Sequence, residues 1–131
     1  MAAHFFCPKC WKEVEDWTII CPHCKYDIPK HAALSFEEKL IYTLSHPIDD
    51  SRMMAIQLLG DIHSRRALPY FAAILETEED FYVIREIIRA LNKIGGEESK
   101  NLIRRLKTHK SKLISSMANR ICAKWELQRH F

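Results

Sequence analysis

Four of the five cysteines lie in two Cys-Pro-x-Cys pairs near the start of the chain, and they are the residues best suited to chemistry. The pairs are Cys7 with Cys10 and Cys21 with Cys24. Two-residue spacing serves redox chemistry, disulfide formation and metal binding. A redox pair is expected in a βαβ context, which is missing here, and clustered cysteines in a reducing compartment are more often metal ligands than disulfides. The spacing therefore predicts a metal site.

Residues 11–20 separate the two pairs and leave room for a short hairpin, the layout of a zinc ribbon. Each pair can form a tight turn with both sulfurs facing one ion. Four thiolates suit tetrahedral zinc, with iron as the alternative in the same geometry. A zinc ion with four protein ligands has no open coordination position, so one structural Zn²⁺ is predicted. His4 and His23 are substitute ligands only in principle, and we expect both to face solvent.

The cysteine segment is too small to sustain a core unaided, so metal binding should supply its folding energy. It has only nine apolar side chains to bury: Phe5, Phe6, Trp11, Val14, Trp17, Ile19, Ile20, Tyr26 and Ile28. Residues 4–29 resemble the short zinc-ribbon family, whose pattern is CPxC, a variable hairpin and CPxC. The glycine that commonly follows each pair in that family is replaced here by Trp11 and Lys25. The resemblance implies an adaptor for protein or nucleic-acid contacts rather than a catalyst.

From residue 36 onward, apolar residues recur at helical spacing with no alternating strand pattern, which predicts an all-α region. Residues 27–35 are predicted to be a linker because Pro29 breaks regular structure, and Ser35 with Glu38 predicts a capping box that opens the first helix. We expect helices over residues 36–45, 49–62, 66–75, 80–94, 97–107 and 111–128. Two domains follow, a zinc ribbon over residues 1–30 and a helical domain over residues 36–131.

The helical region contains an internal repeat. Residues 54–75 align with residues 86–107 at a shift of 32, and a weaker third copy follows at a shift of 31. The aligned apolar pairs include Leu59 with Leu91, Ile62 with Ile94 and Phe71 with Ile103. Periods in the thirties built of two helices are typical of α-solenoids. The predicted fold is therefore mostly α, with a small N-terminal zinc ribbon and about three antiparallel helix pairs.

Residues 46–62 (HPIDDSRMMAIQLLGDI) and 66–75 (RALPYFAAIL) resemble the HEAT-like repeats of the phycobilisome-lyase type. Pro47, Arg52, Gly60 and the RALP turn at residues 66–69 carry the resemblance, which extends over residues 36–127. It implies a binding scaffold whose inner helices hold a partner.

Charge is unevenly distributed along the chain. The net charge is +3, yet residues 97–131 carry nine Lys or Arg against three Asp or Glu. Five basic residues lie at one predicted helix end and its turn: Arg104, Arg105, Lys107, Lys110 and Lys112. They are interpreted either as ordinary helix-terminal charges or as a patch for an anionic partner. No apolar run suits a membrane span and the first residues do not resemble a signal peptide, so we expect a cytoplasmic protein.

Catalytic motifs are missing. The sequence contains no glycine-rich phosphate loop, GxSxG or HExxH motif, and Cys122 lies alone on an apolar stripe, where a small buried side chain is expected. The chain is therefore predicted not to be an enzyme but a zinc-binding scaffold or adaptor for a protein partner. The alternative is a small nucleic-acid-binding factor that uses the basic C-terminal third and the ribbon.

Overall fold

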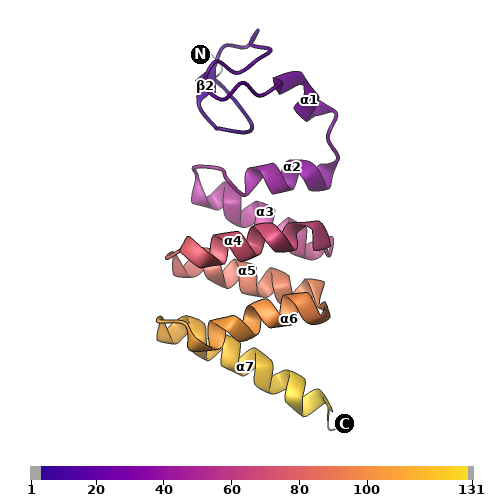
Figure 1. Ribbon diagram of the computed structural model, residues 1–131, viewed down its shortest axis with the longest axis vertical. Coiled ribbons are helices and arrows are strands. Elements are labelled where there is room, and N and C mark those ends of the chain that lie inside the picture. The colour runs from indigo at the N-terminus through magenta and orange to yellow at the C-terminus, as the bar shows by residue number, and fades with distance from the viewer. Residues whose placement is uncertain (1–3, 130–131) are drawn as a thin grey trace. The chain divides into compact units, whose positions relative to one another are not determined.

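The computed structural model describes residues 4–129, which form a small two-stranded sheet followed by seven α-helices (Figure 1). Strands β1 (Phe5–Phe6) and β2 (Glu13–Val14) pair antiparallel, with Phe5 opposite Val14. The helices are α1 (Ile28–Ala32), α2 (Phe36–Thr43), α3 (Asp49–Asp61), α4 (Leu68–Thr77), α5 (Phe81–Ile94), α6 (Gly96–Arg105) and α7 (Lys112–Arg129). Short 3-10 turns cover Arg65–Ala67 and Leu106–Thr108. The predicted fold class, a small N-terminal sheet followed by helical repeats, is confirmed. Among the described helices, none has the length and apolar character needed to cross a bilayer.

The six predicted helices are all present, and one further helix was not predicted. Helix α1 lies in the segment that the sequence assigns to a linker, so that prediction is wrong. Pro29 occupies its first turn, where the missing backbone N–H would have no intrahelical partner, and the proline therefore permits the helix. The capping box before α2 is confirmed, because the backbone N–H of Glu38 donates to Ser35 Oγ at 3.1 Å and the Glu38 carboxylate accepts from the Ser35 N–H.

The chain forms two compact units, one ending at Ala55 and the other beginning at Ile56, so the boundary falls within α3. The first unit contains the strands, α1, α2 and the start of α3, with Leu40 and Leu44 buried. The division expected from the sequence, into residues 1–30 and 36–131, remains a prediction.

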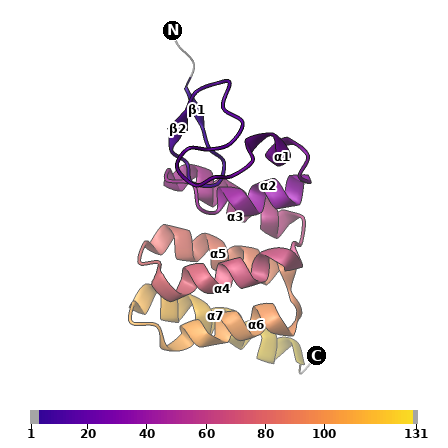
Figure 2. The same ribbon diagram turned by 45° about the horizontal axis from the view of Figure 1, so that its top comes forward.

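The second unit contains the main apolar core. Helix α5 contacts α4, α6 and α7, while α4 also contacts α6 (Figures 1 and 2). Repeat-equivalent positions are buried as the periodicity predicts, for example Phe71 in α4 with Ile103 in α6. In the third copy, Ile114, Ala118 and Cys122 are buried along α7, so Cys122 occupies a core position.

Helices α3 and α5 approach each other closely at Gly60. A Cβ atom added to this glycine would lie 2.8 Å from Ala90 Cα. Around this contact, the Gln57 side-chain amide donates to Glu86 at 3.2 Å, and Lys93 forms an ion pair with Asp61 at 2.6 Å. Gly60, one of the residues that carry the resemblance to HEAT-like repeats, therefore permits close packing between α3 and α5.

Candidate metal centre

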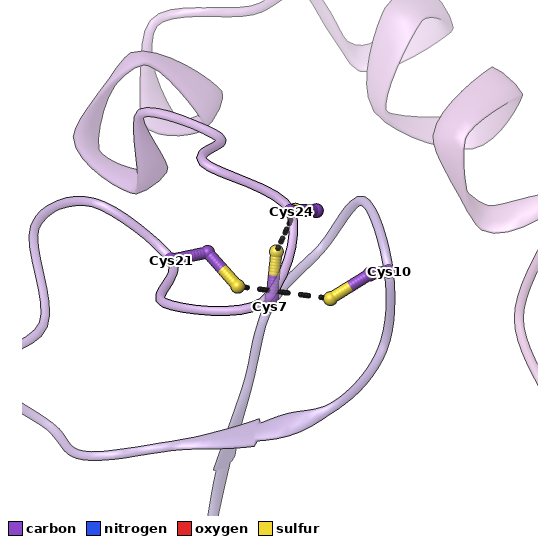
Figure 3. Close-up of side chains that lie close together, drawn as sticks. All are labelled: Cys7, Cys10, Cys21 and Cys24. Carbon is purple, nitrogen blue, oxygen red and sulfur yellow. Dashed lines mark hydrogen bonds between the residues drawn. The ribbon is translucent and has the colours of Figure 1, made fainter.

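The four cysteines of the CPxC pairs come together in one cluster (Figure 3). All four sulfur atoms lie within 4.8 Å of one another, with Cys7 Sγ 3.6 Å from Cys24 Sγ and Cys10 Sγ 3.7 Å from Cys21 Sγ. These separations are far longer than a disulfide bond, and all four cysteines are free. Four sulfurs at the corners of a tetrahedron with metal–sulfur distances of about 2.3 Å would be separated by about 3.8 Å. The cluster could therefore hold one metal ion.

The two CPxC pairs form matching backbone turns. The N–H of Trp11 donates to the carbonyl of Cys7 at 2.8 Å, and the N–H of Lys25 donates to the carbonyl of Cys21 at 2.9 Å. In each turn a further backbone N–H points at the first sulfur, at 3.5 Å from Lys9 to Cys7 and at 3.4 Å from His23 to Cys21. The hairpin therefore presents two equivalent half-sites, each with a buried first cysteine.

The residue after each pair has a left-handed backbone conformation. Trp11 has φ 64° and Lys25 has φ 67°. This region favours glycine, because a Cβ atom there approaches the following carbonyl oxygen. Neither residue is glycine, so both turns carry some backbone strain at these positions.

The thiols of the second half-site differ in acidity. Burial acts to raise the pKa of Cys21, but hydrogen bonds from the backbone N–H groups of Cys24 and His23, together with neighbouring thiols, lower that pKa to about 6. Burial, with the neighbouring thiols of Cys7, Cys21 and Cys10, raises the pKa of Cys24 to about 11. Cys21 is thus the more readily ionised of the two, and a bound cation would favour the thiolate form of every ligand. His4 and His23 are exposed, as expected, and His4 contacts Glu13.

The cysteine hairpin (residues 4–29) contacts α2 and the loop after it through Trp11 and Tyr26. Trp11 Nε1–H donates to Ser45 Oγ at 3.0 Å, and the Trp11 ring lies 4.4 Å from that of His46. After the second turn, Tyr26 lies 5.6 Å from the ring of Tyr42 on α2. Aromatic side chains therefore connect the cysteine cluster to α2 and to the loop after it.

The apolar side chains of the hairpin do not form a core of their own. Five of the nine are between 46 and 75% exposed: Phe5, Phe6, Trp17, Ile19 and Ile20. The remaining four are half-buried. These side chains therefore do not sustain a core, as the sequence predicts, and the cysteine cluster is what brings the two turns together.

The predicted basic patch runs from the end of α6 to the start of α7: Arg104, Arg105, Lys107, Lys110 and Lys112. Its members have different surroundings. Arg104 is half-buried, pairs with Glu97 at 3.4 Å and lies over the ring of Trp125 at 5.7 Å. Lys110 pairs with Glu79 at 3.6 Å. Arg105, Lys107 and Lys112 are exposed, with no ion pair among residues 4–129.

A second basic surface lies on α5 and α7, and the sequence-based patch omits it. Arg120 and Lys124 are the equivalents of Arg89 and Lys93 at the shift of 31, and all four are exposed. We call them the α5–α7 cation array. Arg89 pairs with Glu86 at 3.1 Å and Lys93 with Asp61, whereas Arg120 and Lys124 form no ion pair within the described range. The repeat alignment contains the signal for this array, since equivalent positions of adjacent repeats lie on one face.

Comparisons with known proteins give one match. Residues 37–119 match the family model described as HEAT repeats. No curated protein and no solved structure matches the chain. The matched segment runs from α2 into the first half of α7 and includes both copies of the 32-residue repeat. This chain therefore belongs to the HEAT-repeat family.

Proposed function

We propose that this protein is a non-enzymatic scaffold or adaptor that binds a protein partner and contains one structural zinc ion. The HEAT-repeat stack is the observation that carries this proposal. Stacked helix pairs contact their neighbours and leave an extended surface for a partner, which is the common use of such arrays. Fold alone does not fix the task, so the partner's chemistry has to come from the exposed side chains.

The metal proposal rests on the donor set. Cys7, Cys10, Cys21 and Cys24 supply four sulfurs at separations that fit a tetrahedral ion, and thiolate-rich tetrahedral sites favour zinc. Four protein ligands saturate zinc and leave no position for a substrate or a reactive water. The ion would therefore stabilise the hairpin and take no part in turnover. A zinc-ribbon role for residues 4–29 follows as part of the same proposal.

For the partner surface we propose the exposed face of α3, α5 and α7. The α5–α7 cation array adds four positive charges on two adjacent helices, and only two of them have acidic partners in the described structure. An acidic protein segment fits this array, since complementary charge accelerates association and fixes orientation. The basic patch near residues 104–112 is the alternative site for the same class of partner.

Matched charge reversals test which surface is used. The array variant Arg120→Glu/Lys124→Glu and the patch variant Arg105→Glu/Lys107→Glu both change exposed residues by the same charge. Capture from lysate followed by crosslinking and mass spectrometry should show a partner that is lost with the array variant and kept with the patch variant. The reverse result would move the site to the patch, and equal retention by both would refute a charge-guided surface.

The second candidate function is nucleic-acid binding. It is favoured by Trp125, whose ring has Lys100 at 5.4 Å and Arg104 at 5.7 Å, a combination of aromatic and basic side chains that suits single strands. A gel-shift titration at two salt concentrations separates the candidates. Binding that falls steeply with salt, and capture that nuclease abolishes, would favour nucleic acid over a protein partner.

A further inference from the structure

Three of the five exposed apolar side chains of the cysteine hairpin, Phe5, Trp17 and Ile20, line a groove. Phe5, Val14, Trp17, Ile20 and Pro22 line a concave surface with a volume of about 800 Å³. Phe5 and Val14 are cross-strand partners, whereas Trp17 lies in the turn that follows β2. Trp17 is 75% exposed, and such a large side chain in water at the edge of an apolar groove marks a contact surface.

The same groove is acidic. Glu13, Glu15 and Asp16 line it and are exposed, and none of its lining residues, all within the described range, is Lys or Arg. The Glu15 carbonyl accepts a hydrogen bond from the Thr18 N–H at 3.0 Å, so a closed turn holds the two turn acids beside Trp17. The groove therefore combines apolar side chains with three carboxylates, one of which, that of Glu13, also contacts His4.

This combination discriminates among classes of ligand. Nucleic acid is disfavoured because its phosphates would face three carboxylates. Small-molecule sites usually enclose most of their ligand, whereas the apolar residues here stay broadly exposed. A polypeptide with alternating cationic and apolar side chains satisfies both parts, since its cations meet the carboxylates or the face of Trp17 and its apolar side chains cover Phe5 and Ile20.

We propose that this groove, lined by residues of the 5–22 segment, is a docking site for a basic, apolar segment of a partner protein. The site belongs to the hairpin alone and uses no residue of the α5–α7 cation array. Its partner has the opposite charge to the one proposed for that array. Failure of one proposal therefore leaves the other unaffected.

The test uses the full-length, zinc-loaded chain and a synthetic 12-residue peptide of alternating Lys and Leu. Two control peptides replace Lys by Glu, or Leu by Ser. The indole N–H resonances of Trp11, Trp17 and Trp125 report the site by NMR, and calorimetry gives the affinity. We expect the Lys–Leu peptide to shift the Trp17 resonance and leave the other two in place, with both control peptides binding at least about tenfold more weakly.

Variants with a matched control complete the experiment. Trp17→Ala and Glu15→Lys/Asp16→Lys should each weaken the Lys–Leu peptide by about tenfold or more. Glu76→Lys/Glu98→Lys, the same charge change at exposed residues elsewhere, should change its affinity less than about twofold. Unchanged zinc content shows that each variant is folded. If Trp17→Ala does not fold, Glu15→Lys/Asp16→Lys alone tests the proposal.

Four results would overturn the proposal. They are equal binding of the Glu–Leu or Lys–Ser peptide, unchanged affinity in both groove variants, a Trp17 shift produced by single-stranded RNA, and a Trp17 shift that depends on protein concentration without peptide. The last would identify a second copy of this chain as the occupant.

Discussion

At the contact between Gly60 and Ala90, helix propensity and overpacking have opposite effects on stability. The sign of the change in the free energy of unfolding on Gly60→Ala therefore shows which effect is larger. Gly60 lies in the last turn of α3, where replacing glycine by alanine would by itself favour the helix by at most about 1 kcal/mol. Against this, the new Cβ would lie 2.8 Å from Ala90 Cα and 2.9 Å from Ala90 Cβ. Because one of these atoms is backbone, a side-chain rotation cannot relieve the overlap, and the helices must move apart.

Overpacking of this kind costs about 1–3 kcal/mol, and an overlap with backbone belongs at the upper end. We therefore expect Gly60→Ala to lower the free energy of unfolding by about 2 kcal/mol after the gain in helix propensity is subtracted. For a unit of this size, the midpoint of thermal unfolding should fall by about 8–16 °C. Circular dichroism at 222 nm measures both quantities, by urea and by heat, because the helices dominate that signal.

A second glycine provides the control. Gly95 has φ 70° and no atom within 4 Å of an added Cβ. Its ψ of −171° places it in a backbone region that only glycine adopts readily, so Gly95→Ala should cost about 1–3 kcal/mol from backbone strain alone, with the α3–α5 packing intact. A Gly60→Ala protein as stable as the wild type, or more stable, would refute close α3–α5 packing and leave helix propensity as the only effect at this position.

Four further predictions follow from the structure. Native mass spectrometry should find one zinc ion per chain, and metal-free protein with two disulfides would contradict the site. Chelation should unfold residues 4–29 and release their aromatic contacts with α2, but leave most helical signal by circular dichroism; complete loss of helicity would mean that the chain folds as one unit. Burial and the charge of Lys39 lower the pKa of His31, which contacts Tyr26 and Tyr42, so the folded chain favours the neutral imidazole. The free energy of unfolding should therefore fall as pH drops below about 6.5, where the unfolded chain takes up the proton first. A His31 pKa at or above 6.5 in an NMR pH titration would contradict this. His63, two residues after the end of α3, has φ 54°, and the backbone N–H groups of His63 and Ser64 donate to the carbonyls of Gly60 and Leu59. His63→Gly should therefore stabilise the chain by about 1 kcal/mol in urea unfolding, and a loss of stability would argue against the left-handed conformation.

The sequence was sufficient for features that depend on local spacing. Cysteine pairs with two intervening residues can face one ion, and the helix boundaries follow from the period of the apolar residues and from Ser35 with Glu38. The 32-residue repeat also identified buried positions such as Leu59 and Leu91. It was less accurate for Ile62, which is 45% exposed because α3 ends at Asp61 and the chain turns there.

Features that depend on tertiary context were missed. A proline in the first turn of a helix looks the same in sequence as a proline that ends one, so α1 was read as a linker. Which of the hairpin's apolar side chains stay exposed does not follow from residue type, because their exposure depends on how the cysteine cluster brings the two turns together. The α5–α7 cation array combines residues about one repeat apart, whereas Arg104 and its neighbours are close in sequence, so clustering along the chain predicts only the second group.

The structure assigns different tasks to different residues of the cysteine hairpin. Trp11 and Tyr26, which directly follow the two turns, contact residues of α2 and of the loop after it, so the geometry of the cluster determines how the hairpin meets its neighbouring helix. Trp17, in the middle of the hairpin, has no such contact and stays exposed. Metal binding that orders the two turns would therefore fix both the attachment to α2 and the shape of the acidic groove. Removal of the ion by a chelator should then abolish peptide binding at Trp17 while the helices from Ile56 onward remain folded, because only the hairpin depends on the ion.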